Sequence, residues 1–167
     1  MAMRPFYLKN QTKIADISKN IWYNLTMRIL CVDYGDARTG LAISDELEMI
    51  ASPLKTYKMK SMRCAVDYVA NIAHCERAQL IVVGLPLNMD GSEGVRASKT
   101  RAFGRVLQKV SGLDVVYRDE RLTSVEAEEI LKQGGVGFAE RKELVDSMAA
   151  RLILQSYLES NKNERSI

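Results

Sequence analysis

The sequence predicts an α/β fold in which a mixed five-stranded sheet lies between two layers of helices. The first indication is a close succession of three apolar or extended segments between residues 29 and 57, which is typical of an antiparallel meander. The second is that later apolar segments alternate with helical patterns, as in parallel strands joined by helices. A chain of 167 residues with 47% hydrophobic and 27% charged residues also fits one globular domain.

The predicted meander consists of three strands. Residues 29–32 are an apolar run that ends at the turn-forming residues 33–36. Residues 40–44 follow so closely that we expect an antiparallel hairpin. A third extended segment covers residues 52–57.

Helices then connect the remaining strands. Apolar residues recur at helical spacing between residues 62 and 73, and the wholly apolar run 80–83 predicts a strand buried on both faces. A second helix, with Val95 and Val110 among its inward residues, precedes the last strand, 114–117. Numbering the strands along the chain, we expect the order 3-2-1-4-5 in the sheet.

Two helices complete the predicted domain. Residues 123–126 have the spacing of a capping box, which starts a helix that ends near Gln133. The glycine-rich segment 134–137 forms a loop, and the final helix covers residues 139–159. The apolar residues expected to face inward on that helix are Leu144, Val145, Met148, Ala149, Leu152 and Ile153.

Residues 1–26 differ from the rest of the chain and form an N-terminal extension to a single domain, residues 27–167. The extension carries four basic residues and one acidic residue, so the domain itself is formally neutral. Apolar residues at helical spacing predict a short amphipathic helix there. Either Met27 is the natural start and the extension is a misread upstream segment, or the extension is a docking arm.

Composition excludes several classes of protein. The three cysteines, Cys31, Cys64 and Cys75, are odd in number and lack metal-ligand spacing, which indicates reduced thiols in a cytoplasmic protein. A lone histidine, His74, and the lack of a CxxC motif argue against a structural zinc site. No apolar run approaches the roughly 18–20 residues of a membrane span, so we expect no membrane partner.

Three carboxylates are the candidate catalytic and metal-binding residues. Asp33 and Glu120 follow predicted strands at the edge of the sheet where ligands bind in such folds. Asp146 lies at the margin of the inward face of the last helix, from which it could join them. Each residue alone also fits an ordinary role, as a turn former, a surface ion pair or a solvated helix residue. Gathered in one pocket the three would repel one another, and a divalent cation would relieve that repulsion.

All-oxygen ligation favours Mg²⁺ or Mn²⁺, and two such ions promote in-line displacement at phosphorus.

Two further patterns are less specific. The glycine-bounded loop 84–91 either approaches a substrate backbone or caps the next helix. The basic row Arg101, Arg105 and Lys109 is either a solvated helix face or a strip that contacts phosphates.

Four segments of the chain resemble one known family. They are residues 32–35 with Arg38 and Gly40, then residues 84–92, 119–124 and 145–150. In this order they resemble the YqgF (RuvX) family from residue 28 to about residue 159. The resemblance implies an RNase H-like fold related to the RuvC Holliday junction resolvases. It also implies a nuclease that resolves DNA junctions or matures the 5′ end of pre-16S rRNA.

The resemblance implies that Asp33, Glu120 and Asp146 are the metal-binding acids, the same three residues that the predicted fold indicates. RuvC-type enzymes carry a further acid near the end of the fourth strand, but residues 84–86 of this chain contain none. Glu143, three residues before Asp146, is a weaker candidate for a fourth ligand.

The leading hypothesis is a Mg²⁺- or Mn²⁺-dependent endonuclease that hydrolyses phosphodiester bonds in structured nucleic acid, with pre-16S rRNA favoured as the substrate. Asp33 would bridge two ions, and Glu120 and Asp146 would each complete one coordination sphere. The expected substrate-binding residues are Arg38, Asn88 and Arg121. The two arginines could equally orient the acids through salt bridges.

Two other functions stay open. A DNA junction resolvase would use the same site but needs a two-fold dimer to cut paired strands, whereas the rRNA nuclease could be a monomer or a weak homodimer. A non-catalytic nucleic-acid-binding or ribosome-assembly factor would need no metal. Because residues 27–167 are formally neutral, any nucleic acid must bind to local basic clusters rather than to a general positive field.

Overall fold

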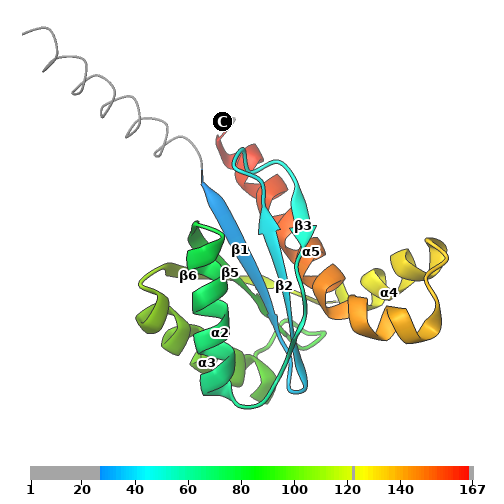
Figure 1. Cartoon of the computed structure of the whole chain (residues 1–167), viewed down its shortest axis with the longest axis horizontal. Helices are drawn as coiled ribbons and strands as arrows, with labels where there is room; N and C mark the ends of the chain where they lie inside the picture. Colours follow the sequence, from blue (N-terminus) through cyan, green and yellow to red (C-terminus); the bar gives the residue numbers. More distant parts are fainter. Residues whose placement is uncertain (1–26, 122, 166–167) are drawn as a thin grey trace, which may run out of the picture.

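A computed structural model describes residues 27–121 and 123–165, and the expectations for residues 1–26 lie outside these ranges. Figure 1 shows a twisted sheet with helices on both of its faces. Within the described ranges, no helix is both long and apolar enough to cross a membrane. The elements in chain order are β1 (Arg28–Tyr34), β2 (Arg38–Ser44), β3 (Ala51–Pro53), β4 (Tyr57–Lys58), α2 (Met62–Cys75), β5 (Ala78–Leu85), α3 (Val95–Ser111), β6 (Asp114–Asp119), α4 (Thr123–Gln133) and α5 (Phe138–Arg165).

The sheet has the predicted mixed topology, with one strand more than expected. β1 is antiparallel to β2 and parallel to β5, and β6 pairs with β5 in parallel. The order β3-β2-β1-β5-β6 follows the order predicted for five strands. The third predicted strand, however, is divided into β3 and β4, which both pair with β2. Pro53 ends β3, because proline has no N–H to donate to a strand ladder.

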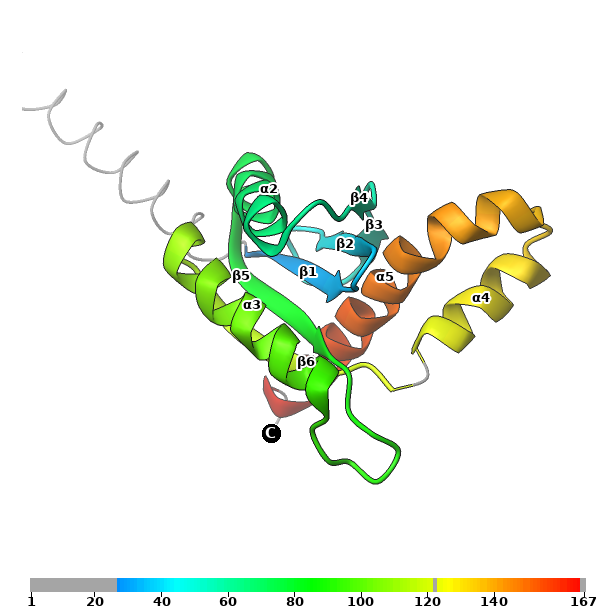
Figure 2. The same cartoon turned by 90° about the horizontal axis from the view of Figure 1, so that it is seen from below.

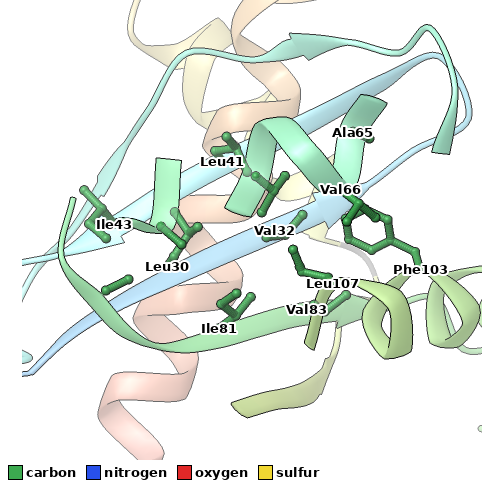
Figure 3. Packing of buried hydrophobic residues seen from close by; sticks show 13 residues of the cluster. Leu30, Val32, Leu41, Ile43, Ala65, Val66, Ile81, Val83, Phe103 and Leu107 are labelled. Carbon is green, nitrogen blue, oxygen red and sulfur yellow. The ribbon is translucent and has the colours of Figure 1, made fainter. Parts of the chain in front are cut away.

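Alternation along the strands separates two hydrophobic clusters. Leu30 and Val32 of β1 pack in the cluster that includes α2 and α3, whereas Ile29 and Cys31 pack in the cluster that includes α5. Figure 3 shows the first cluster, in which Phe103 of α3 lies against the sheet. Figure 2 shows the resulting layers, with α2 and α3 on one face and α5 on the other.

The buried face of α5 differs from the predicted one. Its buried residues in the described part of the helix are Ser147, Ala149, Ala150, Ile153, Leu154 and Leu158. Leu144, predicted to face inward, is 37% exposed. The first turns of α5 lie beyond the sheet beside α4 (Figure 2), so apolar residues there do not mark the face that meets the sheet. Asp146 therefore lies on the buried face, four residues before Ala150, rather than at its margin.

The predicted inward face of α3 is wrong at both ends of the helix. Val95 is 77% exposed and Val110 is 47% exposed. The buried residues of α3 are Ala97, Thr100, Phe103, Gly104 and Leu107. Val95 and Arg96, at the start of α3, are thus left exposed after the loop that leaves β5.

Candidate active site

Strand alternation brings Asp33, Gly84 and Glu120 to the face of the sheet that α5 covers. Asp33 lies two residues after Cys31, and Gly84 two residues after Val82, both of which pack in the cluster beneath α5. Because β1, β5 and β6 run parallel, their carboxyl ends meet at one edge of the sheet. Glu120 follows β6 at that edge, so residues far apart in the sequence share one site.

Gly84 leaves the space that the Glu120 carboxylate occupies. A Cβ atom at residue 84 would lie 2.1 Å from Glu120 Oε2 and 2.9 Å from Ile153 Cδ1. Any side chain at this strand position would displace the carboxylate, so the close approach requires glycine. The end of β5 offers no acid of its own and instead accommodates the acid that follows β6.

Gly40 permits a similar approach by α5. It pairs with Asp33 across β1 and β2. A Cβ atom at residue 40 would lie 1.9 Å from the backbone carbonyl oxygen of Asp146. The backbone of α5 therefore touches the strand beside Asp33, which brings Asp146 to the same edge of the sheet.

Burial and mutual repulsion raise the pKa values of the two strand-end carboxyls. Removal from water raises the pKa of Asp33 from 3.8 to about 6, and the negative charge of Asp146 adds to the rise. Burial and the neighbouring Asp33 raise the pKa of Glu120 from 4.5 to about 8. The contact between the two carboxyls lowers the pKa of Asp33 and raises that of Glu120, so the two groups titrate as a pair.

Asp146 lies within electrostatic reach of Asp33 but binds Arg38. Its Oδ2 accepts a hydrogen bond from Nε of Arg38, and the aspartate side chain is 24% exposed. Within the described ranges, no group of three His, Cys, Asp or Glu side chains is arranged to hold a metal ion. The structure thus brings Asp33 and Glu120 together and turns the third expected acid toward an arginine.

The oxygens at this edge of the sheet nevertheless suit a hard cation. Glu120 Oε2 is buried and has no hydrogen-bond partner among the residues that the structure describes. A buried carboxylate oxygen without a partner is unfavourable, and either a proton or a cation removes that cost. Carboxylate oxygens are also the ligands that Mg²⁺ and Mn²⁺ prefer. Asp33 and Glu120 therefore fit a divalent metal ion.

Arg96 is a candidate functional residue that the sequence analysis missed. Its positive charge lowers the pKa values of both Asp33 and Glu120, so its guanidinium lies within electrostatic reach of the two carboxyls. The signal that could have found it is its position. Arg96 is a cation in the first turn of the helix after β5, near the edge where ligands bind in such folds.

Two of the expected substrate-binding residues support the loop between β5 and α3. Arg121 donates to the carboxylate of Asp119 and, from Nη1, to the backbone carbonyl of Met89 at 3.2 Å. Asn88 donates its side-chain amide to the hydroxyl of Ser92 in the same loop. Figure 2 shows this loop projecting from the edge of the sheet. Both residues therefore shape the border of the site rather than its carboxylate centre.

The basic row on α3 is not a uniform strip. Arg101 donates to the carboxylate of Glu93, and its guanidinium lies 4.7 Å from the ring centroid of Tyr117. Arg105 and Lys109 are exposed. One of the three cations is therefore committed to contacts within the protein, which favours the solvated-face interpretation for this row.

Sequence comparison finds close relatives of this chain. A family model described as "RuvX: Holliday junction resolvase" matches residues 27–160. A protein of Syntrophus aciditrophicus is 44% identical over 83% of this chain and 93% of its own length. A protein of Caldanaerobacter subterraneus subsp. tengcongensis is 42% identical over 82% of this chain and 99% of its own. Both are named as proposed pre-16S rRNA nucleases.

Solved structures share the architecture. Thermus thermophilus RuvC in complex with a Holliday junction substrate has a TM-score of 0.54 at 17% identity, covering 82% of this chain and 96% of that chain. The fowlpox virus resolvase in complex with Holliday junction DNA has a TM-score of 0.53 at 17% identity, covering 81% of this chain and 99% of that chain. These similarities confirm the RNase H-like fold.

Proposed function

This chain belongs to the RuvX family, and we propose that it is a metal-dependent endonuclease that hydrolyses phosphodiester bonds in structured RNA. The substrate that we propose is precursor 16S rRNA, the substrate for which the Syntrophus relative is named. We assign the activity to a single domain, residues 27–167. A cytoplasmic location agrees with the free thiols of its three cysteines.

One observation carries the proposal, namely the burial of Asp33 beside Glu120 at the carboxyl ends of parallel strands. Burial raises the pKa values of both carboxyls, and the charge of Asp33 raises that of Glu120 further. One buried oxygen of Glu120 also lacks a hydrogen-bond partner in the described part of the chain. Paired acids of this kind reduce stability unless something positive binds them. A bound divalent cation would supply that charge.

We assign Asp33, Glu120 and Asp146 as the ligands of two Mg²⁺ or Mn²⁺ ions. Asp33 interacts electrostatically with both other carboxyls, so it would hold the ions together with either of them. When bound, such ions act as Lewis acids that activate a water molecule and stabilise the departing oxygen. The remaining contributions come from residues of the chain itself.

The neighbouring arginines would control the charge and the availability of the acids. Arg96 favours loss of the Glu120 proton, because its positive charge lowers the pKa of that carboxyl. Asp146 must release Arg38 to become a ligand, and the freed guanidinium could then bind a phosphate oxygen. Hydrolysis forms a bond from the water oxygen to phosphorus and breaks the bond to the 3′ oxygen, which leaves a 5′ phosphate and a 3′ hydroxyl.

A cleavage assay with two substrates tests the proposal. Labelled pre-16S leader RNA and a DNA four-way junction are incubated with the protein and Mg²⁺, Mn²⁺ or EDTA. We expect the RNA to be cleaved with either metal, and to stay intact with EDTA or with the Asp33→Asn variant. If only the DNA junction is cleaved, and sedimentation shows that the protein is a dimer, the substrate is reassigned to DNA. RNA binding without cleavage under any condition would support the non-catalytic function instead.

A further inference from the structure

A groove runs along the first half of α5, near the Arg38–Asp146 ion pair. Its volume is about 630 Å³, and it lies between the β3–β4 segment and α5. The lining includes Arg38, which binds Asp146, and Ser147, the next residue of α5. The groove therefore ends beside Asp146, the carboxylate that Arg38 binds.

Positive charge is concentrated on the strand side of this groove. Arg38 and Lys58 are direct partners in the pairing of β2 with β4, and Lys55 lines the same groove. Like charges directly opposite one another on neighbouring strands repel. Neither lysine has an ion-pair partner in the described ranges of the chain. An anion bound beside Lys58 would relieve its repulsion with Arg38.

The helix side of the groove contains one acidic residue and a hydrogen bond to the strand side. Glu143 is the single carboxylate among the residues that line it. The hydroxyl of Thr56 donates to the backbone carbonyl of Glu143 at 3.4 Å, which ties the β3–β4 segment to α5. Arg38 is paired with Asp146, so Lys55 and Lys58 face one carboxylate, Glu143. The groove thus keeps a small excess of positive charge that the neutral domain as a whole lacks.

The outer end of the groove presents an aromatic ring. Phe138, the first residue of α5, is 76% exposed. The guanidinium of Arg141 lies 5.9 Å from the centroid of this ring, beside a separate hollow of about 220 Å³. At a rise of 1.5 Å per residue, Phe138 and Ser147 are about 14 Å apart along the helix. An exposed ring beside a row of cations is typical of sites on which unpaired bases stack.

We infer that this groove binds an unpaired segment of the RNA substrate, with phosphates on Lys55 and Lys58 and a base stacked on Phe138. The inference rests on the proposed nuclease function and specifies which part of the substrate the protein recognises, a single strand that leads away from the scissile phosphate. An acidic segment of a protein would satisfy the lysines but would leave the exposed ring without a role.

RNA binding at several salt concentrations tests the inference. The full chain carrying Asp33→Asn, which should leave RNA intact, is titrated into a fluorescent single-stranded RNA and into a duplex of the same sequence. For the single strand, the double variant K55Q/K58Q should reduce the magnitude of the slope of log affinity against log salt concentration by about 1.4. Phe138→Ala should weaken single-strand binding roughly 5-fold or more and leave duplex binding unchanged. The double variant R105Q/K109Q removes two exposed cations from α3 and should change neither.

The inference is overturned if K55Q/K58Q binds the single strand with the unaltered salt dependence, or if R105Q/K109Q weakens binding as much. It is also overturned if the groove variants lose affinity for a polyglutamate peptide and not for RNA, because the occupant would then be an acidic protein segment. The same groove variants are also made in the chain that keeps Asp33, and their RNA cleavage separates the two proposals. Efficient RNA cleavage with an unchanged KM would reject the groove and retain the nuclease function, whereas no cleavage by the unsubstituted chain would reject the nuclease function.

Discussion

Gly40 lies directly against the backbone of Asp146, so that a Cβ atom on the glycine would be 1.9 Å from the aspartate carbonyl oxygen. The same glycine is the strand partner of Asp33. One position without a side chain therefore fixes how close α5 comes to the sheet and how close the third acid comes to the first.

Gly40→Ala should destabilise the fold because the added methyl group meets helix backbone, which cannot rotate away. We expect a loss of about 2 kcal/mol in the free energy of unfolding and a fall of roughly 5 °C in Tm. Thermal unfolding followed by circular dichroism measures both. Gly134→Ala is the matched control, since its nearest new neighbour would be 3.4 Å away, and an equal loss there would contradict the packing argument.

Gly84→Ala should weaken metal binding at the site more than it lowers the stability of the fold. The new methyl group would lie 2.1 Å from Glu120 Oε2 and must push that carboxylate out of its position. We expect Mn²⁺ affinity to fall by roughly 10-fold or more, the scale seen when groups that support metal ligands are changed. Calorimetric titration with Mn²⁺ measures this, and undiminished affinity would show that Glu120 does not need the space beside residue 84.

Without divalent ions, the protein should lose stability as the pH rises. The pKa values of Asp33 and Glu120 in the folded chain, about 6 and about 8, exceed their ordinary values of 3.8 and 4.5. Between pH 4 and 8 the folded chain therefore holds protons that the unfolded chain has lost, so its stability declines across this range. The loss should be on the order of 5 kcal/mol in urea unfolding, and the larger part of it should vanish in Glu120→Gln. A flat or rising profile in the unsubstituted chain would contradict the buried-pair arrangement.

Arg96→Gln should move the pH dependence of cleavage to higher pH. The arginine lowers the pKa of both strand-end carboxyls, so its removal raises them and makes the ionised pair available only at higher pH. We expect the acid limb of the kcat/KM profile to shift upward by roughly half a unit to one unit. Arg105→Gln, also on α3 and exposed, should leave the limb in place.

The sheet and its two strand-end acids were predictable because period-two alternation is a local property of the sequence. Once residues 29–32 and 80–83 are parallel neighbours, Asp33 must lie at the ligand-binding edge of the sheet. The division of the third strand was missed because Pro53 removes only one donor from an otherwise extended segment.

The helices were harder to orient from sequence. Leu144 and Val145 extend the apolar pattern of α5 into turns that lie beside α4 and not on the sheet, so the predicted buried face was rotated away from the observed one. Because of that rotation, the prediction placed Asp146 at the margin of the buried face. A salt bridge from Arg38 to one of the acids was an alternative that the sequence left open, and the structure shows it with Asp146. The choice of Asp146 as the partner depends on the close approach at Gly40, which the sequence pattern does not reveal.

The most direct measurement of the central idea is calorimetric titration of Mn²⁺ into the unsubstituted chain, Asp33→Asn and Glu120→Gln at pH 6 and pH 8. A metal ion must displace the proton shared by this pair, so the affinity of the unsubstituted chain should rise between the two pH values. Both variants should lose stoichiometric binding while keeping the far-ultraviolet circular dichroism of the folded protein. Equal Mn²⁺ uptake by all three proteins would mean that these two acids do not hold the metal, and the proposed reaction would lose its site.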